Sequence, residues 1–151
     1  MDPFTMNDSS PREEAFPAPS KKATGTVNGV STEVESISFS DKIMITVSQG
    51  GRLAQWVQVP LAEPSSSSIG IPLPGAGSVL PGTHLTAKTL IGGGNPERET
   101  LGHLYASQIA SHLTLRDPDE KRTLLLGLGL EKIEGESDAF FDLLELVMQI
   151  L

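Results

Sequence analysis

The sequence predicts an α+β domain in which five strands are followed by a helix, a sixth strand and a second helix, with the helices packed on an antiparallel meander sheet. Between residues 23 and 61, apolar and polar side chains alternate with period two, and short turn sequences separate the runs. Residues 96–116 and 138–151 instead repeat apolar side chains every three or four positions, as helices with a buried side do. A chain of 151 residues can bury one core, so we expect a single domain at residues 23–151.

The first two strands are predicted to form a hairpin. The Asn-Gly pair at residues 28–29 readily adopts the positive φ angles of a type I′ turn, whose twist matches that of the flanking strands. Beyond this turn, Val30 and Val34 fall on one side of the second strand, whereas Ile37 falls on the other. We therefore expect a β-bulge near residues 35–36 that restores the inward direction.

The third and fourth strands flank a second turn sequence. Alternation at residues 43–47 places two isoleucines and a valine on one face of the third strand. The glycine pair at residues 50–51 suits a two-residue hairpin turn. The fourth strand then repeats the alternation, and its inward set is Leu53, Val57, Val59 and Leu61. Pairing in chain order is what predicts the meander.

Two segments lack any apolar period. Residues 1–22 are rich in proline, serine and charge, so we expect a disordered tail, and residues 1–5 resemble the remnant of an expression vector. Residues 62–82 contain a serine run among prolines and glycines, which predicts a flexible loop. Alternation resumes in a fifth strand at residues 84–91.

Helix signals follow the fifth strand. Asn95 is a good N-cap, Pro96 fits the first helical position, and the apolar stripe ends near Asp117. In the next strand, residues 124–130, leucines occupy one face. Leu125, Gly127 and Gly129 form the other face, where the small residues permit close approach by a helix or by backbone. We expect this strand to be central and covered on both faces. The last helix is expected at residues 138–151.

Composition excludes several functional classes. The formal net charge is −8, and an acidic domain repels the phosphate backbone of nucleic acids, so no nucleic-acid partner is expected. No apolar run is long enough to span a membrane, and residues 1–20 have none of the apolar core that a secretory signal needs. The absence of cysteine favours a reducing compartment, so we expect a cytoplasmic or nuclear protein.

No catalytic residue, metal site or cofactor is predicted. His84, His103 and His112 lack the four-residue spacing that directs two imidazoles at one metal ion. The carboxylates at residues 117–119 flank a proline, as in a solvated turn. Glycines 92–94 precede a helix and could hold a phosphate through backbone amides, although the loop lacks a P-loop lysine. The alternative is a plain connecting loop.

The last helix carries more apolar surface than one sheet contact requires. We therefore predict that it binds a partner, and the candidate residues are Phe140, Phe141, Leu144, Val147, Met148 and Leu151. Phe141 and Met148 should face the partner, whereas Phe140 and Leu144 should face the domain's own core. The alternative is that the domain buries this helix from several sides. Acids dominate this end of the chain and would steer it toward a basic surface, unless they form only a solvated face.

Four blocks of the sequence resemble the proteasome assembly chaperone 3 family. The most specific is the strand, turn and strand of residues 43–53, where an apolar run leads into Ser-Gln-Gly-Gly-Arg-Leu. Residues 28–34 are similar to the opening strand of that family, and residues 89–92 and 125–131 are similar to its remaining blocks. The chain departs from the family pattern at Ala54, where glycine is common, and in its long loop at residues 62–82.

The resemblance implies a chaperone without catalytic activity. Such a protein pairs with a proteasome assembly chaperone 4-like subunit, or forms a homodimer in its absence, and binds proteasome α subunits while the 20S α-ring assembles. Two alternatives remain. A roadblock-like or longin-like scaffold dimer would usually place a helix between pairs of strands, and a small phosphate-binding domain would use the glycines at residues 92–94.

Overall fold

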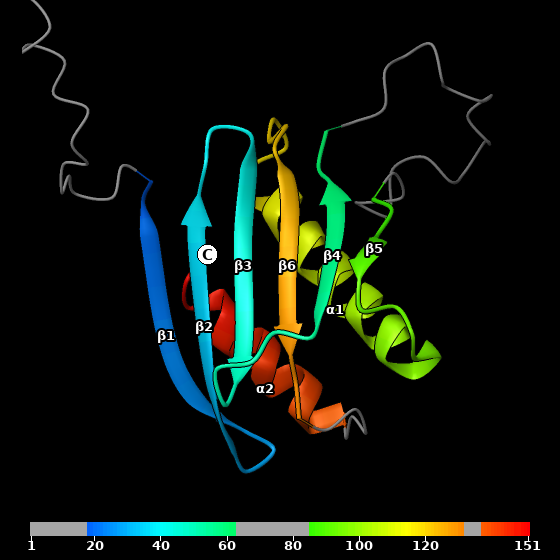
Figure 1. The fold of residues 1–151 in the computed structure, drawn as a ribbon. Helices are drawn as coiled ribbons and strands as arrows, with labels where there is room; N and C mark the ends of the chain where they lie inside the picture. The colour runs from blue at the N-terminus through cyan, green and yellow to red at the C-terminus, as the bar shows by residue number, and fades with distance from the viewer. Residues whose placement is uncertain (1–17, 63–84, 132–136) are drawn as a thin grey trace, which may run out of the picture.

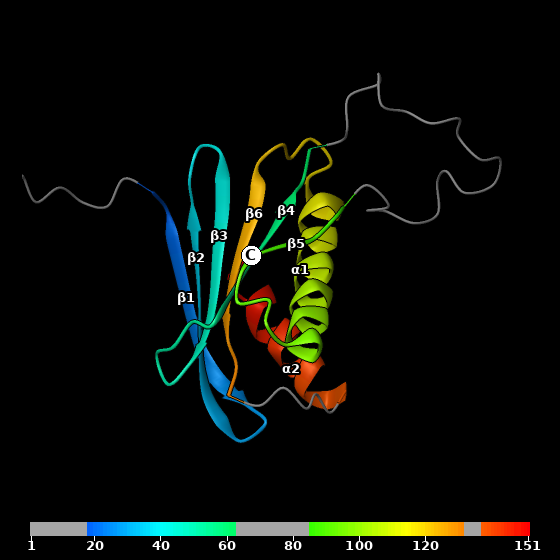
Figure 2. The same ribbon diagram turned by 45° about the vertical axis from the view of Figure 1, so that its right-hand side comes forward.

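The computed structural model describes residues 18–62, 85–131 and 137–151, and these form one six-stranded sheet with two helices on one face (Figures 1 and 2). The elements follow the predicted chain order: β1 (Ser20–Val27), β2 (Val30–Ser38), β3 (Lys42–Gln49), β4 (Gln55–Pro60), β5 (Lys88–Ile91), α1 (Pro96–Arg116), β6 (Thr123–Gly129) and α2 (Ser137–Met148). The α+β class is confirmed.

The order of the strands across the sheet differs from the predicted meander. It is β1-β2-β3-β6-β4-β5, and β6 runs parallel to β3 while the other neighbours are antiparallel, so the sheet is mixed. The expected hairpin between β3 and β4 is therefore wrong. Gly50 and Gly51 do turn the chain with φ angles of 65° and 70°, but only one bridge, from Gln49 to Arg52, closes it.

The chain then crosses the end of β6 and returns on its far side. The amide of Ala54 donates to the Leu128 carbonyl at 2.8 Å, which starts the pairing of β4 with β6. A Cβ atom at Gly129 would overlap the Arg52 carbonyl, so this crossing requires glycine there. The small residues of β6 thus allow close approach, as predicted, but by backbone in this case.

The first hairpin is confirmed, and the bulge is not. Asn28 and Gly29 form the turn with positive φ angles, and β1 starts at Ser20 rather than at residue 23. Strand β2 pairs residue by residue with both β1 and β3, without a change of register. Ile37 consequently points away from the helices, because the strand keeps its alternation. The predicted bulge requires every apolar side chain of β2 to point inward, and Ile37 does not.

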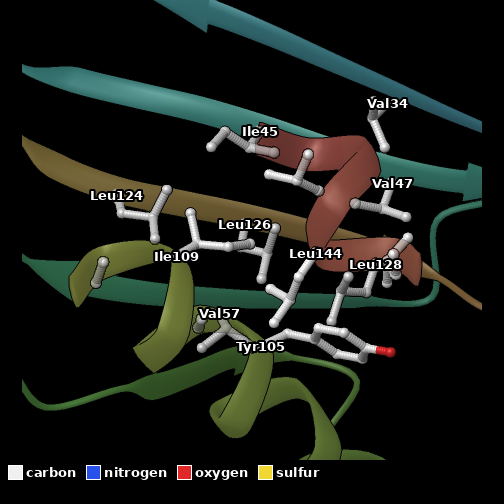
Figure 3. Close-up of a cluster of buried hydrophobic side chains, with 14 of the residues drawn as sticks. Val34, Ile45, Val47, Val57, Tyr105, Ile109, Leu124, Leu126, Leu128 and Leu144 are labelled. Carbon is white, nitrogen blue, oxygen red and sulfur yellow. The ribbon is translucent and has the colours of Figure 1, made fainter. Parts of the chain in front are cut away.

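The hydrophobic core lies between the sheet and the helix layer. Helix α1 packs on β4, β5 and β6, while α2 packs on β1 and β2. Figure 3 shows side chains of the central strands meeting those of both helices. The fully buried members include Val34, Ile45, Val47, Val57, Val59, Ile109, Leu124, Leu126, Leu143 and Val147. We call this side of the sheet the covered face.

Part of the predicted tail, loop and fifth strand cannot be compared with the structure. Residues 1–17 and 63–84 lie outside the described residues, and with them most of the expected tail, most of the expected loop and His84. Strand β5 occupies only the end of the expected segment. Within the described ranges, no helix has the length and apolar character needed to cross a membrane.

Candidate protein-binding surfaces

The predicted partner-binding residues of α2 do not form one surface. Val147 and Leu144 are buried in the domain's own core, and Phe140 is half-buried with its ring centroid 4.6 Å from that of Tyr105. Met148 and Leu151 are half-buried. Phe141 is exposed to 64% and is the one member of the set that points fully into solvent.

The wide sheet of this domain buries most of the surplus apolar residues of α2. Leu146, which was not among the predicted residues, lies over β1, where a Cβ on Gly25 would come within 3.1 Å of its Cδ1 atom. Ile150, just after the helix, is also buried. The alternative in which the domain itself buries this helix from several sides therefore accounts for most of its apolar residues.

Within the described residues, no helix lies on the opposite side of the sheet (Figure 2), and we call this side the open face. Directly paired residues of neighbouring strands point to the same side, so the register defines its rows. One row contains Ile37, Met44, Leu125 and Gln58. The next contains Glu35, Thr46, Gly127, Trp56 and Ile91. Most of these side chains are half-buried, and Ile91 is 66% exposed.

Trp56 lies at the centre of the open face. A Cβ on Gly127 would come within 2.9 Å of the Trp56 indole, so the ring lies directly on the β6 backbone. The ring thereby covers Gly127. The predicted central place of β6 is confirmed, but in the described ranges helices lie on one of its faces only, so the predicted cover on both faces is wrong. A tryptophan held flat in this way offers a large apolar surface at little conformational cost.

Charged side chains of both signs lie on β1 and β2, beside the apolar centre of the open face. Glu33 and Glu35 point outward from β2, and Lys22 of β1 forms an ion pair with Glu33 at 3.0 Å. The hydrogen bond to Glu33 raises the pKa of Lys22. Both side chains are well exposed, so the pair adds little stability. The ion pair does place charged groups beside the apolar side chains of the open face.

Gln49, from the most specific sequence block, joins three segments of the fold. Its buried side chain donates to the Thr32 hydroxyl of β2 at 2.9 Å and accepts from the Glu131 amide, which follows β6, at 2.8 Å. Gly50 then turns the chain away. In the sequence, Gln49 was visible only as a glutamine before two glycines. The structure shows that its side chain links β3 to β2 and to the segment after β6.

The glycine loop before α1 serves packing and capping. A Cβ on Gly92 would overlap the Ala54 carbonyl, and Gly92 has a φ angle of 87°, so glycine is required there. The Asn95 side chain accepts hydrogen bonds from the amides of Glu97 and Arg98 at 2.9 and 3.2 Å. These are the amides that a phosphate would need at this helix end. The plain connecting loop is therefore the better interpretation.

Two more of the polar candidates have structural partners. His103 Nε2 lies 2.7 Å from the Thr89 hydroxyl, and the Asp119 amide donates to Asp117 within their turn. Across residues 18–62, 85–131 and 137–151, no group of three or more histidine or acidic side chains could hold a metal ion. Surfaces for binding protein are thus the features of this domain that invite a functional interpretation.

Comparisons with known proteins complete this description. The sequence profile of a family described as proteasome assembly chaperone 3 matches residues 45–150. No curated protein matches the chain in sequence. Among solved structures, a chain from "Crystal Structure of a Novel Chaperone Complex for Yeast 20S Proteasome Assembly" has a similar fold, with a TM-score of 0.53 and 12% sequence identity. The similarity covers 87% of this chain and 97% of the yeast chain.

Proposed function

Because the chain belongs to the proteasome assembly chaperone 3 family, it acts in proteasome assembly, and we propose that it does so as one half of a chaperone pair joined through the open face. The observation that carries this proposal is the apolar centre of that face, formed by Trp56, Met44 and Leu125. Complete burial of one such side chain is worth about 1.5–3 kcal/mol, so a partner that covers several of them gains substantially.

The partner we propose is a proteasome assembly chaperone 4-like subunit. A second sheet laid on the open face would bury the Trp56 ring and the row containing Met44, as in a sandwich of two sheets. The yeast chain with a similar fold comes from a chaperone complex, which fits a paired arrangement. Ile91, exposed at the β5 edge of this face, would lie at the rim of the contact.

The pair would bind proteasome α subunits and promote assembly of the 20S α-ring, in the cytoplasm and nucleus. The proposal requires no catalytic step, cofactor or metal. A seam on α2, which the sequence predicted, remains the alternative, but only Phe141 is fully exposed there, while Phe140, Met148 and Leu151 are half-buried. A homodimer through the open face would form where the partner is absent.

The proposal is tested by charge placed on each face. Leu125→Glu puts a carboxylate at the centre of the open face, where pairing would bury it without a partner charge. We expect affinity for the chaperone 4-like subunit to fall by about 100-fold or more, measured by calorimetry on the purified proteins. Leu115→Glu is the matched control, because it adds the same charge to an exposed leucine of α1.

The same titration with Phe141→Glu distinguishes pairing through the open face from pairing through α2. If Leu125→Glu binds the partner as well as wild type does and Phe141→Glu loses binding, the seam lies on α2 and the open-face proposal is overturned. Circular dichroism of each variant shows whether the domain is folded. In cells depleted of the protein, Leu125→Glu should also fail to restore 20S particles on native gels, whereas Leu115→Glu should restore them.

A further inference from the structure

The outer side of the helix layer carries a second exposed surface, centred on Phe141. Its ring makes an edge contact with Phe140 at 5.7 Å between centroids, and Phe140 in turn stacks on Tyr105 of α1. Phe141 and the half-buried Phe140 define what we call the aromatic patch.

Acidic side chains surround this patch. Asp138, Asp142 and Glu145 are exposed, and steps of three and four place them on the same side of α2 as Phe141. None of these three carboxylates lies within 4.0 Å of a basic group in the described parts of the chain.

This arrangement of charge works against the stability of α2. Like charges at steps of three and four repel each other, as Asp142 does with Asp138 and Glu145. The last turn of the helix contains no basic residue, and Glu145 lies toward the negative end of the helix dipole. Helix stability therefore explains only Asp138, which lies in the first turn. A positively charged partner would relieve the repulsion and cover the exposed ring.

We propose that the aromatic patch and its acids bind a basic, apolar-centred surface of a proteasome α subunit, while the open face binds the partner chaperone. This inference rests on the proposed function. The two surfaces lie on opposite sides of the sheet, because the helices separate the aromatic patch from the open face (Figure 2). One protein can thus hold both partners at once. The formal charge of −8 adds long-range attraction to a basic client.

The test measures binding of the assembled chaperone pair to separately purified α subunits by biolayer interferometry. Asp142→Lys combined with Glu145→Lys should weaken binding at least 10-fold at low salt and should reduce its salt dependence. Phe141→Ser should weaken binding about 10-fold or more with the salt dependence preserved. Asp119→Lys, at an exposed acid in the turn after α1, is the matched control for each single reversal, Asp142→Lys or Glu145→Lys, because all three change the net charge by the same amount.

The outcomes distinguish this inference from the proposed function. Wild-type binding by the charge-reversal variant and by Phe141→Ser would overturn the inference and leave the pairing proposal intact. Absence of any α-subunit binding by the wild-type pair would overturn both. Equal losses in Asp119→Lys and in the single reversals at Asp142 and Glu145 would show that net charge, and not this surface, attracts the client. Light scattering of each variant with the partner chaperone confirms that the pair itself has formed.

Discussion

The two faces of the sheet are built from the same strands but have different chemistry. The covered face presents valine, isoleucine and leucine that are almost completely buried, such as Ile45 and Leu126. The open face mixes Trp56, Met44 and Leu125 with threonine, glutamine and glutamate. Burial by the domain's own helices selects close-packed aliphatic side chains. A face that is solvated before it meets a partner retains polar groups around an apolar centre.

The largest expected difference between the faces is the response to truncation of adjacent leucines in β6. Leu126→Ala creates a cavity in the core and should lower the free energy of unfolding by about 2–5 kcal/mol. Leu125→Ala should lower it by about 1 kcal/mol or less in the isolated chain, because its side chain is already partly solvated. Urea unfolding measures both. If the two variants lose the same free energy of unfolding, Leu125 is packed as tightly in the isolated chain as a core residue, which would contradict an open face.

The polar residues of the covered face sharpen the comparison. Gln49→Met would leave the Glu131 amide without its acceptor and the Thr32 hydroxyl without its donor, so we expect a loss of about 1–3 kcal/mol. Gln55→Met is the matched variant, because the Gln55 Nε2 atom is buried without a hydrogen-bond partner in the described structure. It should be neutral or stabilising. Similar losses in thermal melts of both variants would contradict this role of Gln49.

The smallest effect concerns the helix layer and appears only at alkaline pH. Burial raises the pKa of Tyr105 from 10.0 to about 12. The unfolded state therefore loses this proton first, so the contribution of the neutral phenol to stability is complete below pH 10 and is lost as the pH rises toward 12. Tyr105→Phe should gain about 1 kcal/mol relative to wild type between pH 9 and pH 11. If urea titrations gave the same difference in unfolding free energy between Tyr105→Phe and wild type at every pH in this range, the raised pKa of Tyr105 would be refuted.

Local signals predicted most of the elements, because they depend on neighbours in the chain. The turn at residues 28–29, the cap at Asn95 and the helical period of α1 all appear where the sequence placed them. The place of β6 in the sheet could not be predicted in this way. A glycine pair such as residues 50–51 turns the chain whether or not the flanking strands then pair, and the insertion of β6 is a contact between distant segments.

The candidate surface was missed for a related reason. Periodicity shows that Ile37 and Met44 lie on the faces of strands, but it does not show which face the helices will cover. Surplus apolar residues in α2 were therefore assigned to a partner, although the domain's own wide sheet buries Leu144 and Val147. The outward phase of Ile37 was interpreted as a bulge. It was in fact the sequence signal of the open face.

The central claim, that the open face binds the partner chaperone, is tested most directly by fluorine NMR of the single tryptophan. Because the chain has one tryptophan, incorporation of 5-fluorotryptophan into this protein alone gives one signal, from Trp56 at the centre of that face. Addition of unlabelled chaperone 4-like subunit should shift this signal and reduce its sensitivity to exchange of H₂O for D₂O. An unchanged signal in a sample that light scattering shows to be fully paired would contradict the claim.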